Sequence, residues 1–304
     1  MHTELNDCVD DFLDNLALQR RLSENTVKSY RRDLNQLVDF AEQQNIQHWS
    51  ELKTSQVRQF IALEHRKGLS GRTIQRMLSA ARSFYQFLIR QGLIDTNPAQ
   101  AVQAPKTEKR LPSTLDVDQM SALLDQTHPD TFVATRDRAM MELFYSSGLR
   151  LAELASLDLR DIDFGDHLLH VTGKGNKDRV CPFGSKALAA LQDWLDKRDS
   201  LGFYNQTAVF ITQQGRRLGV RSIQKRLAYW GKKQGISEHV HPHRLRHAFA
   251  SHMLESSGDL RAVQELLGHA DISTTQIYTH VDFQHLAKVY DSAHPRAKKR
   301  SDSD

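Results

Sequence analysis

The sequence contains little cysteine. Only Cys8 and Cys181 occur among its 304 residues, and they fall in regions that we interpret as different domains. Two thiols in a chain of this length cannot form the disulfide framework of a secreted protein. We therefore expect a protein of a reducing compartment, the cytoplasm.

Long hydrophobic runs are also absent. Nowhere do the roughly 18 apolar residues that a membrane-spanning helix needs follow one another. The beginning of the chain carries acidic side chains where an export signal has a basic region followed by an apolar one. These are Glu4, Asp7, Asp10, Asp11 and Asp14. We expect neither an export signal nor a membrane span.

The motifs of common metal and nucleotide sites are missing as well. No Cys-x-x-Cys pair occurs, and although His243 and His247 are four residues apart, Arg244 and Arg246 lie between them. Cations beside the ligands of a divalent metal are unfavourable, and the zincin pattern requires a glutamate after the first histidine. The Gly-Lys-Gly sequence at 173–175 lacks the rest of a phosphate-binding loop. We expect no metal and no other cofactor.

Positive charge is unevenly distributed. The net charge is only +4, but the stretch from His65 to Arg110 contains nine lysines and arginines against two acidic residues, Asp95 and Glu108. Such a run indicates a polyanionic partner. A solvated helix face followed by a charged linker is the alternative interpretation.

The first part of the chain predicts a helical domain over residues 1–96. A chain of 304 residues with 39% hydrophobic residues is suited to two domains with separate cores. Apolar side chains recur at helical spacing in four segments, 5–16, 23–40, 54–67 and 70–91. Four arginines can project from the other sides of the last helix: Arg72, Arg76, Arg82 and Arg90. This domain therefore has a basic surface suited to a polyanionic partner.

The sequence predicts an interdomain linker at residues 97–113 and a second, mainly α-helical domain at residues 114–304. The linker contains three prolines and no periodic apolar face. In the second domain, apolar runs at 167–171 and 179–183 flank a polar turn with Lys174 and Lys177, which predicts a β-hairpin. Helices are expected at 117–124, 135–145, from about 149, and at 188–195, 222–234, 245–255, 260–267 and 274–278. An amphipathic tail helix with Phe283, Leu286 and Val289 follows.

Six side chains of this second domain are candidates for chemistry: Arg150, Lys174, His243, Arg246, His269 and Tyr278. Taken singly, each has an ordinary structural interpretation, such as an ion-paired arginine, an exposed turn lysine or a half-buried tyrosine. Their combination matches the cleavage of a phosphodiester by a tyrosine hydroxyl. Two guanidinium groups can bind the non-bridging oxygens and stabilise the pentacoordinate phosphorane without a metal ion. A histidine can act as the base for the phenol, and a lysine can protonate the departing 5′-oxygen.

These residues, in this order, resemble the active site of the tyrosine recombinase (phage integrase) family. The resemblance rests on Arg150, Lys174 in a hairpin, His243-x-x-Arg246, Leu-Leu-Gly-His269 and Tyr278, and it covers nearly the whole chain. It implies a helical core-binding domain and a catalytic domain that close on DNA as a clamp. It also implies that Tyr278 forms a 3′-phosphotyrosyl bond, which a 5′-hydroxyl then attacks to give a Holliday junction.

The resemblance further implies a role for each helper and a biological setting. Arg150 and Arg246 would bind the phosphate, Lys174 would be the general acid, His243 an acid/base and His269 a hydrogen-bond donor to the phosphate. The partners would be a double-stranded recombination site and a second, related recombinase in a heterotetramer. The setting would be the resolution of chromosome dimers before cell division, with the tail helix donated to a neighbouring subunit or docked on its own domain.

Other functions remain open at this stage. A phage or integron integrase would use the same chemistry, but we see no arm-binding domain or inserted helix. A DNA-binding regulator without catalysis would have no need of Tyr278 and its five helpers. A metal-dependent nuclease would need clustered carboxylates that the catalytic stretch lacks.

Overall fold

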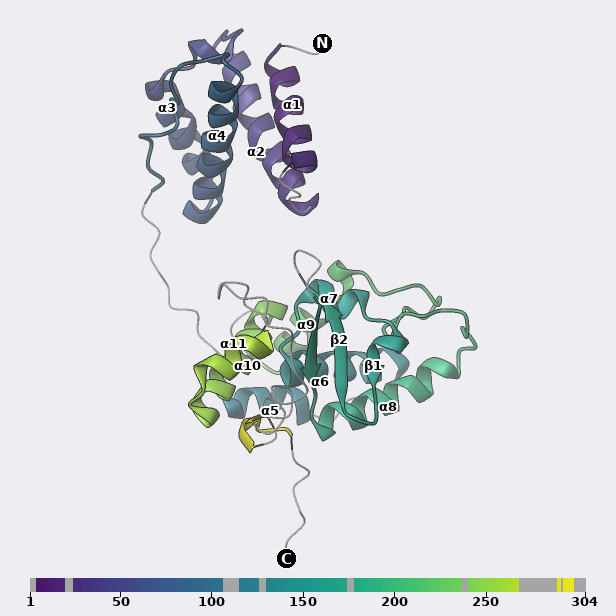
Figure 1. The fold of residues 1–304 in the computed structure, drawn as a ribbon. Helices are drawn as coiled ribbons and strands as arrows, with labels where there is room; N and C mark the ends of the chain where they lie inside the picture. The colour runs from purple at the N-terminus through teal and green to yellow at the C-terminus, as the bar shows by residue number, and fades with distance from the viewer. Residues whose placement is uncertain are drawn as a thin grey trace, which may run out of the picture. The chain divides into compact units, whose positions relative to one another are not determined.

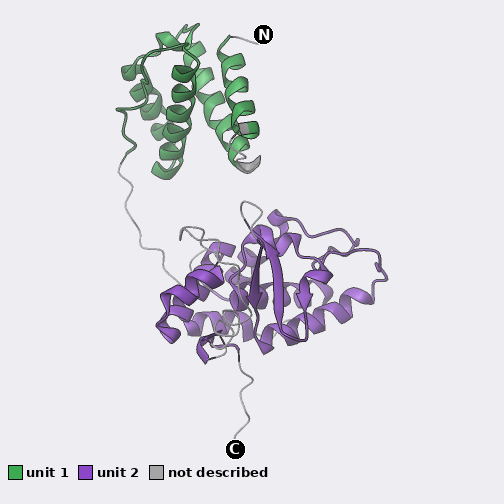
Figure 2. Cartoon of the chain, viewed as in Figure 1, with its two compact units in different colours: residues 1–111 green, residues 112–304 purple. Residues whose placement is uncertain are grey.

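The chain forms two compact units, residues 1–111 and 112–304 (Figure 2). The computed structural model describes residues 4–19, 24–105, 115–125, 130–173, 178–236, 240–267, 289–290 and 292–297. Each unit has its own hydrophobic core. Within these ranges, no helix combines the length and the apolar character needed to cross a membrane.

Unit 1 is a helical bundle that confirms the four predicted helices (Figure 1). They are α1 (Glu4–Gln19), α2 (Glu24–Gln43), α3 (Thr54–Arg66) and α4 (Gly71–Arg90), with a short 3-10 helix at Trp49–Glu51. Aromatic rings join them: Phe84 of α4 lies edge-on to Phe12 of α1, with ring centroids 5.5 Å apart, and to Trp49 at 4.9 Å. Ser70 caps α4 by accepting a hydrogen bond from the Thr73 amide at 3.3 Å.

The segment after α4 packs on unit 1 where we expected the linker to begin. Ala99 and Val102 are buried in the core of this unit. Arg82 of α4 donates to both of their carbonyl oxygens, from Nε to Ala99 at 3.1 Å and from Nη2 to Val102. The chain therefore leaves unit 1 several residues later than position 97.

Two of the four α4 arginines are held within unit 1. Arg82 binds the carbonyl oxygens just described, and Arg76 forms a two-bond ion pair with Asp33, at 2.9 and 2.8 Å. Arg72 and Arg90 are exposed. The basic surface of α4 is thus smaller than its sequence suggests.

Unit 2 is mainly α-helical with a small antiparallel sheet (Figure 1). Its helices are α5 (Val117–Asp125), α6 (Phe132–Ser147), α7 (Leu151–Ser156), α8 (Ser185–Asp199), α9 (Val220–Lys233), α10 (Pro242–Ser257) and α11 (Leu260–Leu267), with a 3-10 turn at Leu159–Asp161. The sheet order is β1-β2-β3, with β1 (Ile162–Asp163), β2 (Leu168–Thr172) and β3 (Asp178–Pro182). The predicted hairpin is confirmed within one residue as β2 and β3. Strand β1, two residues long, was not predicted.

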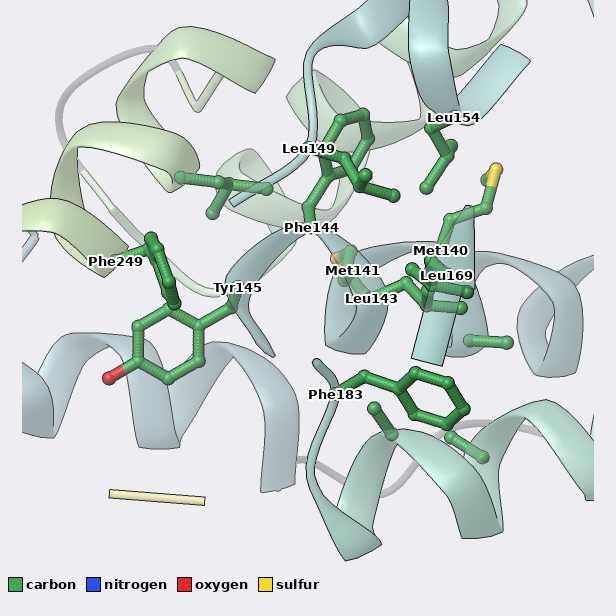
Figure 3. Packing of buried hydrophobic residues seen from close by; sticks show 14 of the residues in the cluster. Met140, Met141, Leu143, Phe144, Tyr145, Leu149, Leu154, Leu169, Phe183 and Phe249 are labelled. Atoms are coloured by element: carbon green, nitrogen blue, oxygen red, sulfur yellow. The ribbon is translucent and has the colours of Figure 1, made fainter. Parts of the chain in front are cut away.

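The middle of unit 2 is α6, which is buried along most of its length. Figure 3 shows its apolar side chains, among them Met140, Leu143 and Phe144, packed with Leu169 of β2 and with Phe183. On another side, the fully buried carboxylate of Asp137 accepts a hydrogen bond from the indole of Trp230 in α9 at 2.9 Å. Because α6 contacts α10 and strand β3 and is followed directly by α7, it holds in place the elements that carry the candidate site.

The described tail residues dock on their own unit. The Tyr290 hydroxyl lies 2.6 Å from the Ser146 hydroxyl of α6, and the buried Arg296 pairs with Glu142 of α6 and Asp125 of α5. The sequence left two alternatives for the tail helix, donation to a neighbouring subunit or docking on its own domain. Residues 289–290 and 292–297 pack on unit 2 of the same chain, where Arg296 pairs with the buried carboxylate of Glu142. Phe283 and Leu286 lie outside the described residues.

His294 makes this docking depend on pH. Its Nδ1 accepts from the Arg296 amide at 3.1 Å, so its Nε2, 3.1 Å from the Tyr145 carbonyl oxygen, is the donor of a neutral imidazole. Burial, aided by the nearby Arg296 and His252, lowers the pKa of His294 from 6.5 to about 3. Between these two values the unfolded chain binds a proton that the folded chain does not, so stability falls as the pH falls below 6.5.

We therefore expect acid to destabilise unit 2 through His294. Between about pH 7.5 and about pH 5.5 this residue should remove roughly 1.4 kcal/mol from the free energy of unfolding. The measurement is urea unfolding of the parent and of His294→Gln at both pH values. An equal loss of stability in the two proteins would show that His294 is not responsible.

Candidate active site

The end of α6 turns the chain toward the candidate site. Gly148 follows the helix with a φ of 57°, and its amide donates to the Phe144 carbonyl at 3.0 Å. A Cβ at this position would lie 2.5 Å from a ring carbon of Phe249, in addition to the cost of a left-handed conformation. Glycine is therefore required here, and it allows α7 to begin only three residues later.

Arg150 occupies the N-cap position of α7 and is held by Glu153. The Glu153 carboxylate accepts from the Arg150 backbone amide and from its Nη1, both at 2.7 Å. A cation at a helix N-terminus is disfavoured by the helix dipole, and this carboxylate compensates for it. The Arg150 side chain remains about one-third exposed, at 31%, so it can reach a ligand.

Arg246 meets Arg150 at one carbonyl oxygen. From the first half of α10, Arg246 donates through Nη1 to the Gly148 carbonyl at 2.5 Å and through Nη2 to the Leu267 carbonyl at 2.6 Å. Arg150 Nη2 lies 3.4 Å from the same Leu267 oxygen. Two guanidinium groups 96 positions apart in the sequence thus converge on the last residue of α11, two residues before His269.

The pKa of Arg246 reflects this crowding. Burial, followed by the positive charges of Arg150 and Arg179, lowers it to about 10. The guanidinium remains charged at neutral pH, but its charge is less stable than in water. An anion bound here would relieve that cost, which is how cationic sites select phosphates.

The other candidate residues are placed only in part. His243 is exposed in the first turn of α10, three residues before Arg246, so both side chains project from the same side of the helix. Lys174, His269 and Tyr278 lie outside the described residues. The structure brings Arg150 and Arg246 together and places His243 on the same helix as Arg246.

Sequence reasoning gave no role to two residues of this site, Glu153 and Arg179. Arg179 of β3 is buried, and its Nη2 donates to Glu153 Oε2 at 2.8 Å. A signal existed for each. Glu153 is three residues after Arg150, the spacing of a helical ion pair. Arg179 is two residues before the buried Cys181, so both side chains point to the buried face of the strand, where an apolar residue is usual.

Where the structure describes the chain, it contains no group of three or more histidine, cysteine, aspartate or glutamate side chains that could hold a metal ion. Cys8 and Cys181 are free thiols. Burial raises the pKa of the Cys181 thiol to about 11, which makes it unreactive.

Comparison with known proteins agrees with this architecture. The phage integrase family matches residues 113–285, and its N-terminal SAM-like domain matches residues 9–92. The tyrosine recombinase XerC of Pseudomonas putida (strain W619) is 54% identical over 289 residues, which cover 95% of this chain and 96% of that protein. The XerC of Escherichia coli O157:H7 (strain EC4115 / EHEC) is 49% identical over 297 residues, 98% of this chain and 99% of that protein.

Solved structures share the fold. The pre-cleavage complex of XerH site-specific recombinase bound to difH has a TM-score of 0.67 and 22% identity, and covers 92% of this chain and 83% of that one. A lambda integrase dimer bound to a COC′ core site has a TM-score of 0.69 and 18% identity, and covers 98% of this chain and 80% of that one. The family match over more than half of the chain, together with the XerC relatives at 54% and 49% identity, shows that the chain belongs to the phage integrase family, the tyrosine recombinases that cut and rejoin DNA.

Proposed function

We propose that this chain is a XerC-type site-specific recombinase in which Tyr278 is the nucleophile. The observation that carries the proposal is the convergence of Arg150 and Arg246 on one carbonyl oxygen. Binding a non-bridging phosphate oxygen requires the same convergence. A binding protein would gain from two such arginines, but it would have no use for a tyrosine nucleophile.

The proposed reaction has two transesterification steps. The Tyr278 oxygen bonds to phosphorus while the bond from phosphorus to the 5′-oxygen breaks. The phenol proton passes to a base, for which His243 is the candidate, and Lys174 protonates the departing 5′-oxygen. His269 donates a hydrogen bond to the phosphate. A 5′-hydroxyl from the partner duplex then attacks the phosphorus and loses its proton to Lys174, while the bond from phosphorus to the Tyr278 oxygen breaks and the phenol regains its proton from His243. One phosphodiester is exchanged for another, so the bond energy is conserved and no cofactor is consumed.

The experiment that tests this function is incubation with a nicked DNA site that carries inverted half-sites of the family type. Cleavage beside the nick releases a short fragment that diffuses away. Because its 5′-hydroxyl is then no longer present to reverse the reaction, the covalent protein–DNA adduct accumulates. We expect a shifted band after denaturing electrophoresis, and the same band in excess chelator. The alternative function is that of a phage or integron integrase, which would form the adduct preferentially on an attachment site and not on these inverted half-sites.

Unit 1 would supply much of the DNA affinity. We propose residues 1–96 as the core-binding domain, with the first residues of the predicted linker 97–113 packed on it, and residues 114–304 as the catalytic domain. The support is the set of exposed cations on unit 1, Arg58, Arg66, Arg72 and Arg90. Contacts of such side chains with DNA phosphates make binding strongly dependent on salt.

We propose a second, XerD-like recombinase as partner, in a heterotetramer that resolves chromosome dimers at the terminus recombination site during cell division, in the cytoplasm. The XerC relatives support this role. Plasmid dimers would be resolved in the same way. A tetramer that cuts two of four strands at a time must couple neighbouring active sites, and the tail after Tyr278 is well placed to do so.

We expect Phe283→Ala combined with Leu286→Ala to weaken cooperative loading of a full site beside the partner. These changes leave the Arg296–Glu142 pair intact, so the folded unit should be preserved. Binding of one protomer to a half-site should persist, because it depends on phosphate contacts elsewhere. Gel-shift titration with and without the partner measures both. Undiminished cooperativity would place the partner contact outside this apolar stripe.

Lys174→Ala should slow cleavage mainly because the 5′-alkoxide is a poor leaving group without a proton. A substrate with sulfur in place of that bridging oxygen should restore the cleavage rate, since a thiolate leaves unprotonated. The comparison is the rate of adduct formation on the two substrates, with Lys186→Ala as the matched lysine control. If sulfur gives no rescue, Lys174 is a phosphate contact and another group is the acid.

A further inference from the structure

Arg179 is a buried cation with an unusual set of partners. Its side chain is only 7% exposed. Nη2 donates to Glu153 Oε2 at 2.8 Å, Nη1 lies 3.3 Å from the Cys181 sulfur, and Nε has no hydrogen-bond partner within the described ranges. A thiol is a weak acceptor. Only one of the hydrogen bonds of this guanidinium, the bond to Glu153, is therefore strong enough to offset the cost of burying the charge.

The position would suit an apolar side chain better. Arg179 pairs across the sheet with the buried Val171 of β2, and its side chain shares a buried face of β3 with Cys181. Desolvating a guanidinium costs several kcal/mol, and a buried ion pair is often no more stabilising than apolar residues of similar size. Stability alone is thus a poor reason for an arginine at this place.

The geometry connects Arg179 to the phosphate-binding arginine. Glu153 Oε2 accepts from both Arg179 Nη2 and the Arg150 amide, while its Oε1 accepts from Arg150 Nη1. A continuous path of charged hydrogen bonds therefore runs from β3 through Glu153 to Arg150. Strand β3 is also the second strand of the hairpin whose turn contains Lys174.

We infer that Arg179 is a positioning residue, which fixes Glu153 and thereby the Arg150 guanidinium relative to the hairpin that carries the proposed general acid. This inference rests on the proposed function. Arg179 touches no reacting atom in this arrangement. Its loss leaves Glu153 free to rotate toward Arg150 alone, so that the guanidinium is no longer held for the phosphate.

A positioning role and a merely structural role predict different substrate dependence. Arg150 acts on the negative charge of the scissile phosphate. A methylphosphonate, in which a methyl group replaces one non-bridging oxygen, carries no such charge. A variant with a misplaced Arg150 should therefore be slow on the phosphate and much less impaired on the methylphosphonate. A variant that is only less well folded should lose the same factor on both.

The experiment compares cleavage rates of the full chain on nicked sites with a phosphate or a methylphosphonate at the cleaved position. We expect Arg179→Met to lose on the order of 10- to 100-fold on the phosphate, the scale of a displaced catalytic group, and several-fold less on the methylphosphonate. Arg150→Ala should show the same selectivity. Arg198→Met is the matched control, because Arg198 is a buried arginine that bonds loop carbonyls elsewhere in unit 2.

Arg179→Lys keeps a buried cation and one bond to Glu153, so we expect partial recovery with the same selectivity. It carries the test if the methionine variant does not fold. Equal losses on both substrates, or no loss in either variant, would overturn the inference. If the parent itself forms no covalent adduct on the phosphate site, the proposed function has failed. If the parent cleaves but the Arg179 variants lose the same factor on both substrates, only the inference about Arg179 has failed.

Discussion

Replacing Tyr278 with phenylalanine is expected to abolish the covalent protein–DNA adduct and leave DNA binding unchanged. The substitution removes one oxygen, which is the proposed nucleophile, and keeps the ring. Affinity for a half-site should persist because it comes mainly from cationic contacts with phosphates. No other change of one atom in this chain should have so large an effect on activity.

Two measurements on the same protein test this expectation. Gel shift on an intact site reports binding, and denaturing electrophoresis on a nicked site reports the adduct. Tyr229→Phe is the matched control, since Tyr229 is a half-exposed tyrosine on α9, and it should retain both signals. A denaturation-resistant adduct in the Tyr278 variant would assign the nucleophile to another side chain.

Much of the fold was predictable because its helices are amphipathic. The spacing of apolar residues located α1 to α4, and the polar turn between two apolar runs located β2 and β3. Both patterns arise from local geometry, in which one face of an element is buried. Strand β1 escaped prediction because two residues have no periodicity, and its pairing with β2 is a tertiary contact.

Residues that act through distant partners could not be assigned from the sequence. Arg76 and Arg82 looked like parts of a basic surface, but their partners are 43 and 17 to 20 residues away. The docking of Arg296 on Glu142 spans 154 positions. No local pattern distinguishes an arginine exposed to solvent from one that bridges two segments of the fold.

In the candidate site, too, some features follow from the sequence and others depend on tertiary contacts. The types of its side chains, and the shared helix of His243 and Arg246, follow from the sequence. The meeting of Arg150 and Arg246 at the Leu267 carbonyl, and the use of Glu153 by two arginines, are tertiary facts. The role of Arg179 in particular depends on which face of β3 is buried.

The second large effect should come from the two phosphate-binding arginines. We expect Arg150→Ala and Arg246→Ala each to slow adduct formation on the order of 100-fold or more, the scale for losing one preorganised donor to a developing charge. Arg246→Lys should not restore the rate, because one ammonium cannot replace a planar fork that bonds the Gly148 and Leu267 carbonyls together. The rate is measured in single-turnover cleavage of the nicked site.

The matched control for these variants is Arg138→Ala, which removes a half-exposed arginine of α6 paired with Asp193 at 3.5 Å. It should change the rate little, since exposed ion pairs contribute less than about 1 kcal/mol. Excess chelator should leave cleavage by the parent intact, because guanidinium groups supply the charge that a metal ion provides in other phosphoryl-transfer enzymes. Cleavage that stops in chelator and returns with magnesium, or alanine variants that match the parent, would contradict a site in which Arg150 and Arg246 stabilise the phosphorane.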